Sequence, residues 1–187
     1  MTIPVHVQYR HVHLSVQDRE TLFGSKKLTK RSELPHRGQF SADQTVRIVG
    51  ANGVDLEQVR VLGPERDETQ VELSPTEAFA LGIDAPVRLS GDLSRTGTCD
   101  LVGPAGTVSL RAGVIIPARH LHCNERDAAK LGVVQHQLVT LVPVGHPETK
   151  IELVSVRVHP SFALAFHLSH DEASEFWIEN GNDVILL

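Results

Sequence analysis

The chain has 187 residues, a formal net charge of -5 and 41% hydrophobic but only 4% aromatic residues, so its core must consist mainly of Val, Leu, Ile and Ala. This length allows one or two domains, and valine-rich segments favour strands. The negative charge argues against nucleic-acid binding, and without a run of about 20 apolar residues or a signal peptide we expect an intracellular protein that does not span a membrane.

The first predicted element is a strand. Residues 3–9 alternate in polarity and lead into the motif Arg10-His11-Val12-His13-Leu14-Ser15. Residues two apart on a strand point to the same side, so His11 and His13 present two imidazoles on one face. Imidazole is the commonest metal-ligating side chain at neutral pH, which makes this pair a candidate for metal binding.

Short helices and strands are predicted up to residue 81. Ser15 with Asp18 forms a capping-box pattern at a helix start, and Ser74 with Glu77 forms a second. The polar segment 24–38 is interpreted as a flexible cover. The remaining elements are a helix at 16–23, a strand pair at 45–49 and 58–62 around a turn at 50–53, a strand at 69–73 with Gln70 and Glu72 on one face, and a helix at 75–81.

Four more short strands are predicted in the middle of the chain, at 86–89, 99–102, 107–110 and 113–116. The second half then begins with a repeat of the first motif, Arg119-His120-Leu121-His122-Cys123-Asn124. Asn124 with Asp127, and Ser169 with Glu172, repeat the helix-start pattern. The other elements predicted there are a helix at 125–131, strands near 138–142, 151–158 and 163–167, a helix from about 171 and a strand at 183–187.

Each of the four helix caps is preceded, two residues earlier, by a side chain that binds metals. These side chains are His13, Glu72, His122 and His167. A single His-x-His is more often a pair of surface or core histidines, but structural histidines have no reason to recur behind an arginine and ahead of a helix cap. We therefore predict a duplicated unit with two metal sites, one formed by His11, His13 and Glu72 and the other by His120, His122 and His167.

The predicted elements indicate a mainly β fold with short capping α-helices. Closed barrels leave no exposed strand edges and suit units of short strands better than open sheets do. The strands of the middle segment have no predicted equivalent in the second half, which is therefore short of strands. The N-terminal strand could complete it, so we expect two small β-barrel domains, a duplicated unit with N-terminal strand exchange.

Arg66 lies in the predicted loop 63–69, just before the strand that bears Gln70 and Glu72. Its guanidinium could therefore clamp a phosphate or a carboxylate beside the metals. The alternative, which the sequence alone favours, is a surface salt bridge with Asp67 or Glu68.

Arg10 and Arg119 point to the face opposite to the histidines, so we expect them to form structural pairs or to give electrostatic support. Ser90, in the turn Ser90-Gly91-Asp92, is a candidate for a hydroxyl contact with substrate. Two nitrogen-rich divalent sites with open positions can polarise a carbonyl, stabilise a departing anion or activate water. These residues predict zinc-type chemistry on an anion and leave the substrate open.

Five long segments follow one another along the chain. They are Arg-His-Val-His-Leu-Ser (10–15), Val-Arg-Val-Leu-Gly-Pro-x-Arg…Thr-Gln-Val-Glu (59–72), Ala-Pro-Val-Arg-x-Ser-Gly-Asp-Leu (85–93), Leu-Val-Gly-Pro-x-Gly (101–106) and Gly-Val-Ile-Ile…Arg-His-x-His (113–122). In this order they resemble the PduL-type phosphate propanoyltransferase (phosphotransacylase) family over nearly the whole chain.

The resemblance implies two β-barrel domains, residues 10–117 and residues 118–187 completed by the strand 1–9, with a dimetal site between them. It also implies two zinc ions per chain. The zinc held by His11, His13 and Glu72 would receive the coenzyme A sulfur, and the second would be held by His120, His122 and His167.

The implied reaction converts propanoyl-CoA or acetyl-CoA and phosphate into acyl phosphate and coenzyme A, by direct attack of phosphate. Arg66 would be the catalytic residue that binds phosphate, and Gln70 and Ser90 would line the substrate site. The implied partners are coenzyme A or acyl-CoA, phosphate, and further copies of the chain in a homo-oligomer, with no nucleic acid and no membrane. The implied location is the cytoplasm, with a bacterial microcompartment as a further possibility that the family implies. Members packaged in microcompartments often carry a targeting helix at the N-terminus. In this chain, residues 1–9 indicate a strand instead.

One departure from the family lies ahead of the first arginine. The family usually has a Gly-x-Ser pattern where this chain has His6-Val7-Gln8, and the larger polar groups would reshape the acyl or coenzyme pocket. Two alternative functions use the same residues. One is a metal-dependent acyl-CoA thioester hydrolase with water in place of phosphate, and the other is a metal-binding barrel without catalysis.

Overall fold

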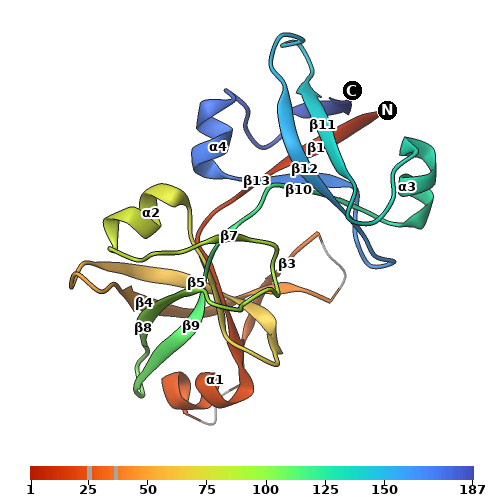
Figure 1. Cartoon of the computed structure of the whole chain (residues 1–187). Coiled ribbons are helices and arrows are strands. Elements are labelled where there is room, and N and C mark those ends of the chain that lie inside the picture. Colours follow the sequence, from red (N-terminus) through yellow and green to blue (C-terminus); the bar gives the residue numbers. More distant parts are fainter. Residues whose placement is uncertain (25–26, 36–37) are drawn as a thin grey trace. The chain divides into compact units, whose positions relative to one another are not determined.

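The computed structural model describes residues 1–24, 27–35 and 38–187 (Figure 1). The chain divides into two compact units, residues 9–117 and residues 1–8 together with 118–187. Each unit contains a closed barrel of six strands with short helices, so the predicted mainly β fold of two barrels is confirmed. None of the helices in the described part of the chain combines the length and apolar character that crossing a bilayer requires.

The first unit, residues 9–117, contains the strands β2 (His11–Ser15), β3 (Lys30–Glu33), β4 (Phe40–Val49), β5 (Asp55–Arg66), β6 (Gln70–Glu72), β7 (Val87–Arg88), β8 (Gly97–Val102) and β9 (Thr107–Pro117). Around the barrel, β4 pairs with β5, β5 with β2, β2 with β6, β6 with β9, β9 with β8, and β8 again with β4. Alternating apolar side chains fill the interior, among them Val12, Leu14 and Val71.

The second unit contains the strands β1 (Thr2–Gln8), β10 (His120–Cys123), β11 (Leu138–Pro143), β12 (Ile151–Val158), β13 (Ala165–Ser169) and β14 (Asp183–Leu186). They close in the order β1-β13-β10-β12-β11-β14. Ile3, Val5 and Val7 of β1 point into this core together with Leu121 and Phe166. The N-terminal strand thus completes the second barrel, as predicted.

The two barrels share one pairing pattern. Each His-x-His strand, β2 or β10, lies between a parallel partner (β5 or β12) and an antiparallel partner (β6 or β13). The antiparallel partner is followed by a parallel strand, β9 in the first barrel and β1 in the second. The rings close through β8 and β4 in the first barrel, and through β14 and β11 in the second.

This pattern corrects one prediction. The segments 99–102 and 107–116 do have equivalents, because β8 corresponds to β14 and β9 corresponds to β1 in their pairing. Each barrel takes the strand that precedes the His-x-His motif of the other half, so the exchange is reciprocal. The order of segments along the chain does not reveal this exchange, because each exchanged strand belongs to the barrel of the other half.

The polar segment 24–38 also differs from its prediction. Lys30–Glu33 forms β3, an exposed strand that pairs with β4. The loop is therefore partly an extension of the sheet, where the sequence suggested only a cover. Residues 25–26 and 36–37 of the predicted cover lie outside the described residues.

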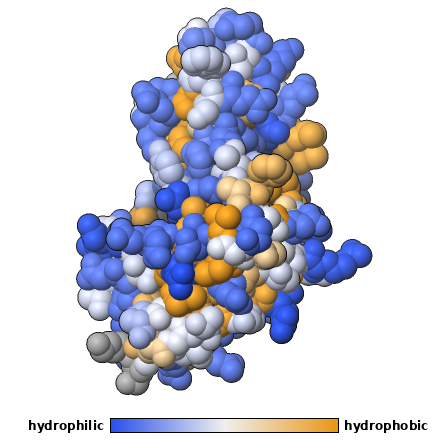
Figure 2. Space-filling view, turned by 90° about the vertical axis from the view of Figure 1, so that its left-hand side faces the viewer, coloured by the Kyte–Doolittle hydropathy of each residue, from blue (hydrophilic) through white to orange (hydrophobic). Residues whose placement is uncertain are grey.

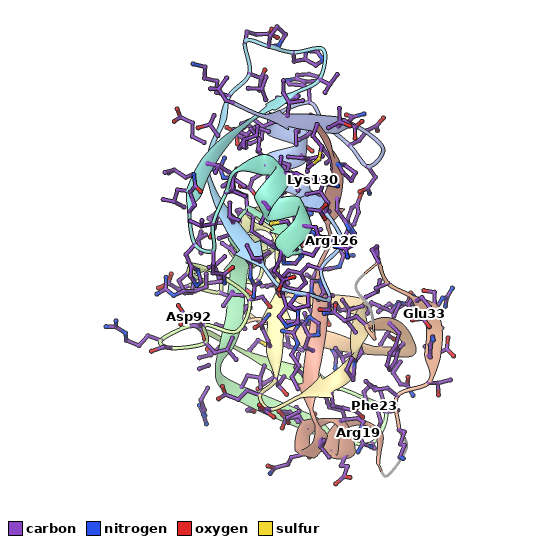
Figure 3. The ribbon with its side chains drawn as sticks, turned by 90° about the vertical axis from the view of Figure 1, so that its right-hand side faces the viewer. Arg19, Phe23, Glu33, Asp92, Arg126 and Lys130 are labelled. Carbon is purple, nitrogen blue, oxygen red and sulfur yellow. The ribbon has the colours of Figure 1, made fainter. Side chains whose placement is uncertain are left out.

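Within the described ranges, four helices begin at the predicted caps. They are α1 (Val16–Phe23), α2 (Pro75–Ala80), α3 (Glu125–Leu131) and α4 (His170–Glu175). The cap residues Ser15, Ser74, Asn124 and Ser169 each accept a hydrogen bond from the backbone three residues on. Arg19 and Phe23 of α1 are labelled in Figure 3. Arg19 is buried and pairs with Glu65 at 3.0 Å, while Phe23 packs into the core.

The two arginines ahead of the His-x-His motifs make equivalent ion pairs. Arg10 Nη1 lies 2.7 Å from Glu77 Oε1, and Arg119 Nε lies 3.2 Å from Glu172 Oε1. Both glutamates are also the third residue of a complete capping box. Each arginine therefore ties the start of its histidine strand to the helix that follows the third predicted ligand.

Ser74→Ala is expected to lower the free energy of unfolding by about 1 kcal/mol, because the α2 amide of Glu77 loses its cap. Urea denaturation followed by circular dichroism measures this change. Ser109→Ala, an exposed position on β9 of the same unit, is the matched control. Equal stability of the two variants would contradict the capping role.

Candidate metal centres

The predicted ligands are polar side chains that are buried. The face drawn in Figure 2 is mostly hydrophilic, and its hydrophobic residues gather mainly in the lower half of the view. Charged and imidazole side chains are rarely buried without a reason. All six predicted ligands are at most 9% exposed, namely His11, His13, Glu72, His120, His122 and His167.

The first three ligands come from two neighbouring strands. β2 and β6 pair in antiparallel register with His11 opposite Glu72. Val12 and Leu14 point into the barrel, so the alternation of the strand turns His11 and His13 to its other face.

The geometry around His11 fits a tetrahedral metal ion. His11 Nδ1 lies 2.9 Å from the carbonyl oxygen of Tyr9, which leaves Nε2 as the ligating nitrogen. His11 Nε2 lies 3.4 Å from Glu72 Oε2. Two ligands of a tetrahedral zinc ion, each about 2.0–2.1 Å from the metal, are separated by about 3.3 Å.

Electrostatics keep this group in its ligating form. Burial raises the pKa of Glu72, but the nearby His11, His13 and Arg66 more than offset burial and hold the pKa of this carboxyl well below its ordinary range. Burial, and then the charges of His11 and Arg66, lower the pKa of His13 well below its ordinary value. Glu72 is therefore an anion and His13 a neutral imidazole at neutral pH, as metal coordination requires.

For His11 itself, burial lowers the pKa, but the ion pair with Glu72 and the carbonyl of Tyr9 outweigh burial, and the pKa is raised. The raised pKa favours a proton on His11 beside the Glu72 carboxylate. A divalent cation would replace that proton, because both atoms face the same point.

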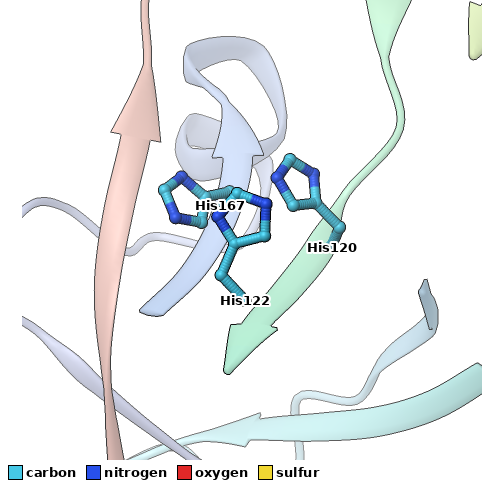
Figure 4. Close-up of side chains that lie close together, drawn as sticks. All are labelled: His120, His122 and His167. Atoms are coloured by element: carbon cyan, nitrogen blue, oxygen red, sulfur yellow. The ribbon is translucent and has the colours of Figure 1, made fainter. Parts of the chain in front are cut away.

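The second group repeats this arrangement on β10 and β13. His120 lies opposite His167 in antiparallel register, the position that Glu72 occupies against His11. His120 Nδ1 lies 2.8 Å from the carbonyl oxygen of Ala118, again two residues earlier. The three rings point toward one another in Figure 4, and the centroid of the His167 ring lies 4.9 Å from that of His120 and 4.6 Å from that of His122.

The ligand atoms of each group lie within 4.8 Å of one another. The structure therefore brings the six predicted residues together as two groups of three, in the combinations predicted from the duplication. Three nitrogen or oxygen donors with a fourth position left open are typical of catalytic zinc sites, so both donor sets suit zinc.

Arg66, Gln70 and Ser90 form a hydrogen-bonded chain beside the first group. Arg66 Nη1 donates to Ser90 Oγ at 3.1 Å, and Gln70 Nε2 donates to the same oxygen at 2.9 Å. Gln70 Nε2 also lies 2.5 Å from Glu72 Oε1. A cavity of about 300 Å³ is lined by His13, by Arg66 and by Gly38, Gln39, Gly63, Pro64 and Glu65. The guanidinium is thus positioned at a cavity that also reaches a candidate metal ligand.

Comparison with known proteins places the chain in a family. The sequence model for phosphate propanoyltransferase matches residues 4–179. The chain belongs to the phosphate propanoyltransferase family. It is 46% identical to the phosphate propanoyltransferase of Thermotoga maritima over 187 residues, covering 99% of this chain and 89% of the relative. The identity is 44% to that of Priestia megaterium (99% and 85% covered) and 41% to that of Salmonella typhimurium (95% and 85%). The family predicted from the motifs is confirmed.

In this member of the phosphate propanoyltransferase family, the sequence did not indicate that Phe162 and Arg157 lie beside the second group of ligands. The ring of Phe162 stacks on His122 with the centroids 3.8 Å apart, and Arg157 Cζ lies 5.8 Å from the centroid of the Phe162 ring. Arg157 pairs in register with His122. Phe162 stands in a turn without periodicity, so its contact could be found only from the fold, whereas the position of Arg157 follows once the strand register is known.

Proposed function

We propose that the protein is a phosphate acyltransferase that converts a short acyl-CoA, propanoyl-CoA or acetyl-CoA, and phosphate into acyl phosphate and coenzyme A. Membership of the phosphate propanoyltransferase family supports this reaction. The observation that carries the proposal is the position of Arg66, which lines one cavity with His13 and is linked through Ser90 and Gln70 to Glu72.

Two zinc ions are the proposed cofactors, one on each group of ligands. Zinc in these positions would supply Lewis-acid chemistry, which polarises a thioester carbonyl and lowers the pKa of a departing thiol. His11 and His120 support this assignment, because a backbone carbonyl fixes the Nδ1 atom of each and thereby orients the ring.

Arg66 has the role of binding phosphate. Its planar guanidinium can hold two phosphate oxygens at once and thereby aim a third at the thioester carbon. The bond between that phosphate oxygen and the acyl carbon forms, the carbon–sulfur bond breaks, and coenzyme A leaves as a thiolate. The acyl group passes directly to phosphate, so the reaction needs no nucleophilic side chain.

Gln70 and Ser90 are proposed to hold this arrangement in place. Gln70 donates from Nε2 to both Glu72 and Ser90, and its Oε1 accepts from the backbone of Gly91 at 2.8 Å. The Ser90 hydroxyl in turn accepts from Arg66. These hydrogen bonds would hold the Arg66 guanidinium at a fixed position relative to Glu72, a proposed ligand of the first metal centre.

The domains, partners and location remain predictions from the family resemblance. We propose two domains, 10–117 and 118–187 with the strand 1–9, that associate into a homo-oligomer in the cytoplasm. Packaging in a bacterial microcompartment is a further proposal. Size-exclusion chromatography with light scattering tests the oligomer.

The test of the proposed reaction is the release of free thiol from propanoyl-CoA by zinc-replete protein, with and without phosphate. We expect release to depend on phosphate and to be matched by acyl phosphate, trapped as the hydroxamate with hydroxylamine. Equal release without phosphate would identify a thioester hydrolase. Absence of release from either acyl-CoA would instead favour a metal-binding barrel without catalysis.

A further inference from the structure

A fourth imidazole adjoins the second group of ligands. His6 lies on β1, which pairs in parallel with β13 so that His6 stands beside His167. The core residues Val5 and Val7 point into the barrel, so the alternation turns His6 to the face that carries the ligands. The ring centroids of His6 and His167 are 4.8 Å apart and the planes are inclined by 31°. This separation is similar to the distances between His167 and its fellow ligands.

The order of the strands places His6 behind His167. β13 lies between β1 and β10, and the registers put His6, His167 and His120 in one row across the three strands. In Figure 4 the pale red strand β1 accordingly runs on the side of His167 away from His120. The group of converging ligand atoms consists of His120, His122 and His167. His6 therefore contacts a ligand from outside, where it can hold that ligand's ring.

In the first barrel, a different side chain supports the third ligand. Its third ligand, Glu72, is held by Gln70, two residues earlier on the same strand. The residue two before His167 is Ala165, which stands opposite His122 as Gln70 stands opposite His13 and has no side chain that can donate. In turn, the position equivalent to His6 is Ile115, beside Glu72 in the parallel pair. Where one barrel has glutamine and isoleucine, the other has alanine and histidine.

We propose that His6 is the positioning residue of the second metal centre, where it replaces the support that Gln70 gives to the first. Its ring packs on His167 and limits the rotation of that ring, so that His167 stays aimed at the metal. The inference rests on the part of the proposed function that assigns a metal to His120, His122 and His167. Groups that orient metal ligands typically change metal affinity by about 10- to 100-fold when they are removed.

The test is a titration of metal-free protein with zinc in competition with a chromophoric chelator, without substrate. His6→Ala should bind one of its two zinc ions about 10- to 100-fold more weakly and the other as the parent does. His6→Phe, which keeps a flat ring against His167, should bind both nearly as tightly as the parent. Gln70→Ala should weaken the other zinc ion, and His146→Ala, an exposed histidine of the same unit, should change neither.

Parent-like binding of both zinc ions by His6→Ala would overturn the proposal, as would binding by His6→Phe that is as weak as that by His6→Ala. Cobalt substitution gives a second readout, since a displaced His167 changes the visible absorption of the second centre only. The titration contains no acyl-CoA and no phosphate. Failure of the proposed acyl transfer therefore leaves its result intact, and the two failures can be told apart.

Discussion

Replacement of Arg66 by alanine is expected to reduce phosphate-dependent thiol release about 10²- to 10³-fold while both zinc ions remain bound. The guanidinium supplies the positive charge and paired donors that hold phosphate, whereas its neighbours Ser90 and Gln70 are uncharged. Steady-state rates over a range of phosphate concentrations, with elemental analysis of the same sample, measure both effects. Arg66→Lys should recover only part of the rate, because an ammonium group cannot bind two oxygens in one plane.

Arg47→Ala is the matched control for this substitution. Arg47 lies on β4 of the same barrel and pairs with Asp55 at 2.9 Å on the surface. This variant should keep the parent rate and the parent dependence on phosphate. Unchanged phosphate dependence in Arg66→Ala would remove Arg66 from the phosphate site.

His122→Ala is expected to lower the zinc content from two ions to one per chain and to reduce acyl transfer by about 10³-fold or more. The reason is that only two nitrogen donors of the second group, His120 and His167, would remain. The first group should be unaffected, since its ligands lie on β2 and β6. Elemental analysis of the purified variant gives the stoichiometry.

His146→Ala removes an imidazole from an exposed loop of the same unit and should retain two zinc ions. His13→Ala, the reciprocal variant, should retain one zinc ion as His122→Ala does, but in the second group. Two ions in His122→Ala would contradict the assignment of this residue as a ligand.

The ligand groups could be predicted because the same local sequence pattern occurs in both halves of the chain. A strand that ends in a ligand residue, followed by one apolar residue and a capped helix, is a local pattern, and the structure repeats it at Glu72-Leu73-Ser74 and at His167-Leu168-Ser169. The register then brings these residues opposite His11 and His120. Local sequence signals were enough to predict the ligand residues, because each helix cap marks where the preceding strand ends.

Non-local pairing was harder to predict. The equivalence of β9 with β1 depends on which strands meet across a barrel, and nothing in either segment alone encodes its partner. The same limit hid the contact of His6 with His167 and the hydrogen bond from Gln70 to Glu72, which appear only once register and side-chain direction are known. Strand β3 was missed because its exposed, polar sequence lacks the alternation of a half-buried strand.

We propose that two zinc centres together support acyl transfer to phosphate. The most direct test is to add zinc stepwise to metal-free protein and to measure phosphate-dependent thiol release from propanoyl-CoA at each step. We predict that the rate reaches its maximum only when two equivalents of zinc are bound. Full phosphate-dependent activity in the metal-free protein, or after one equivalent, would contradict the claim.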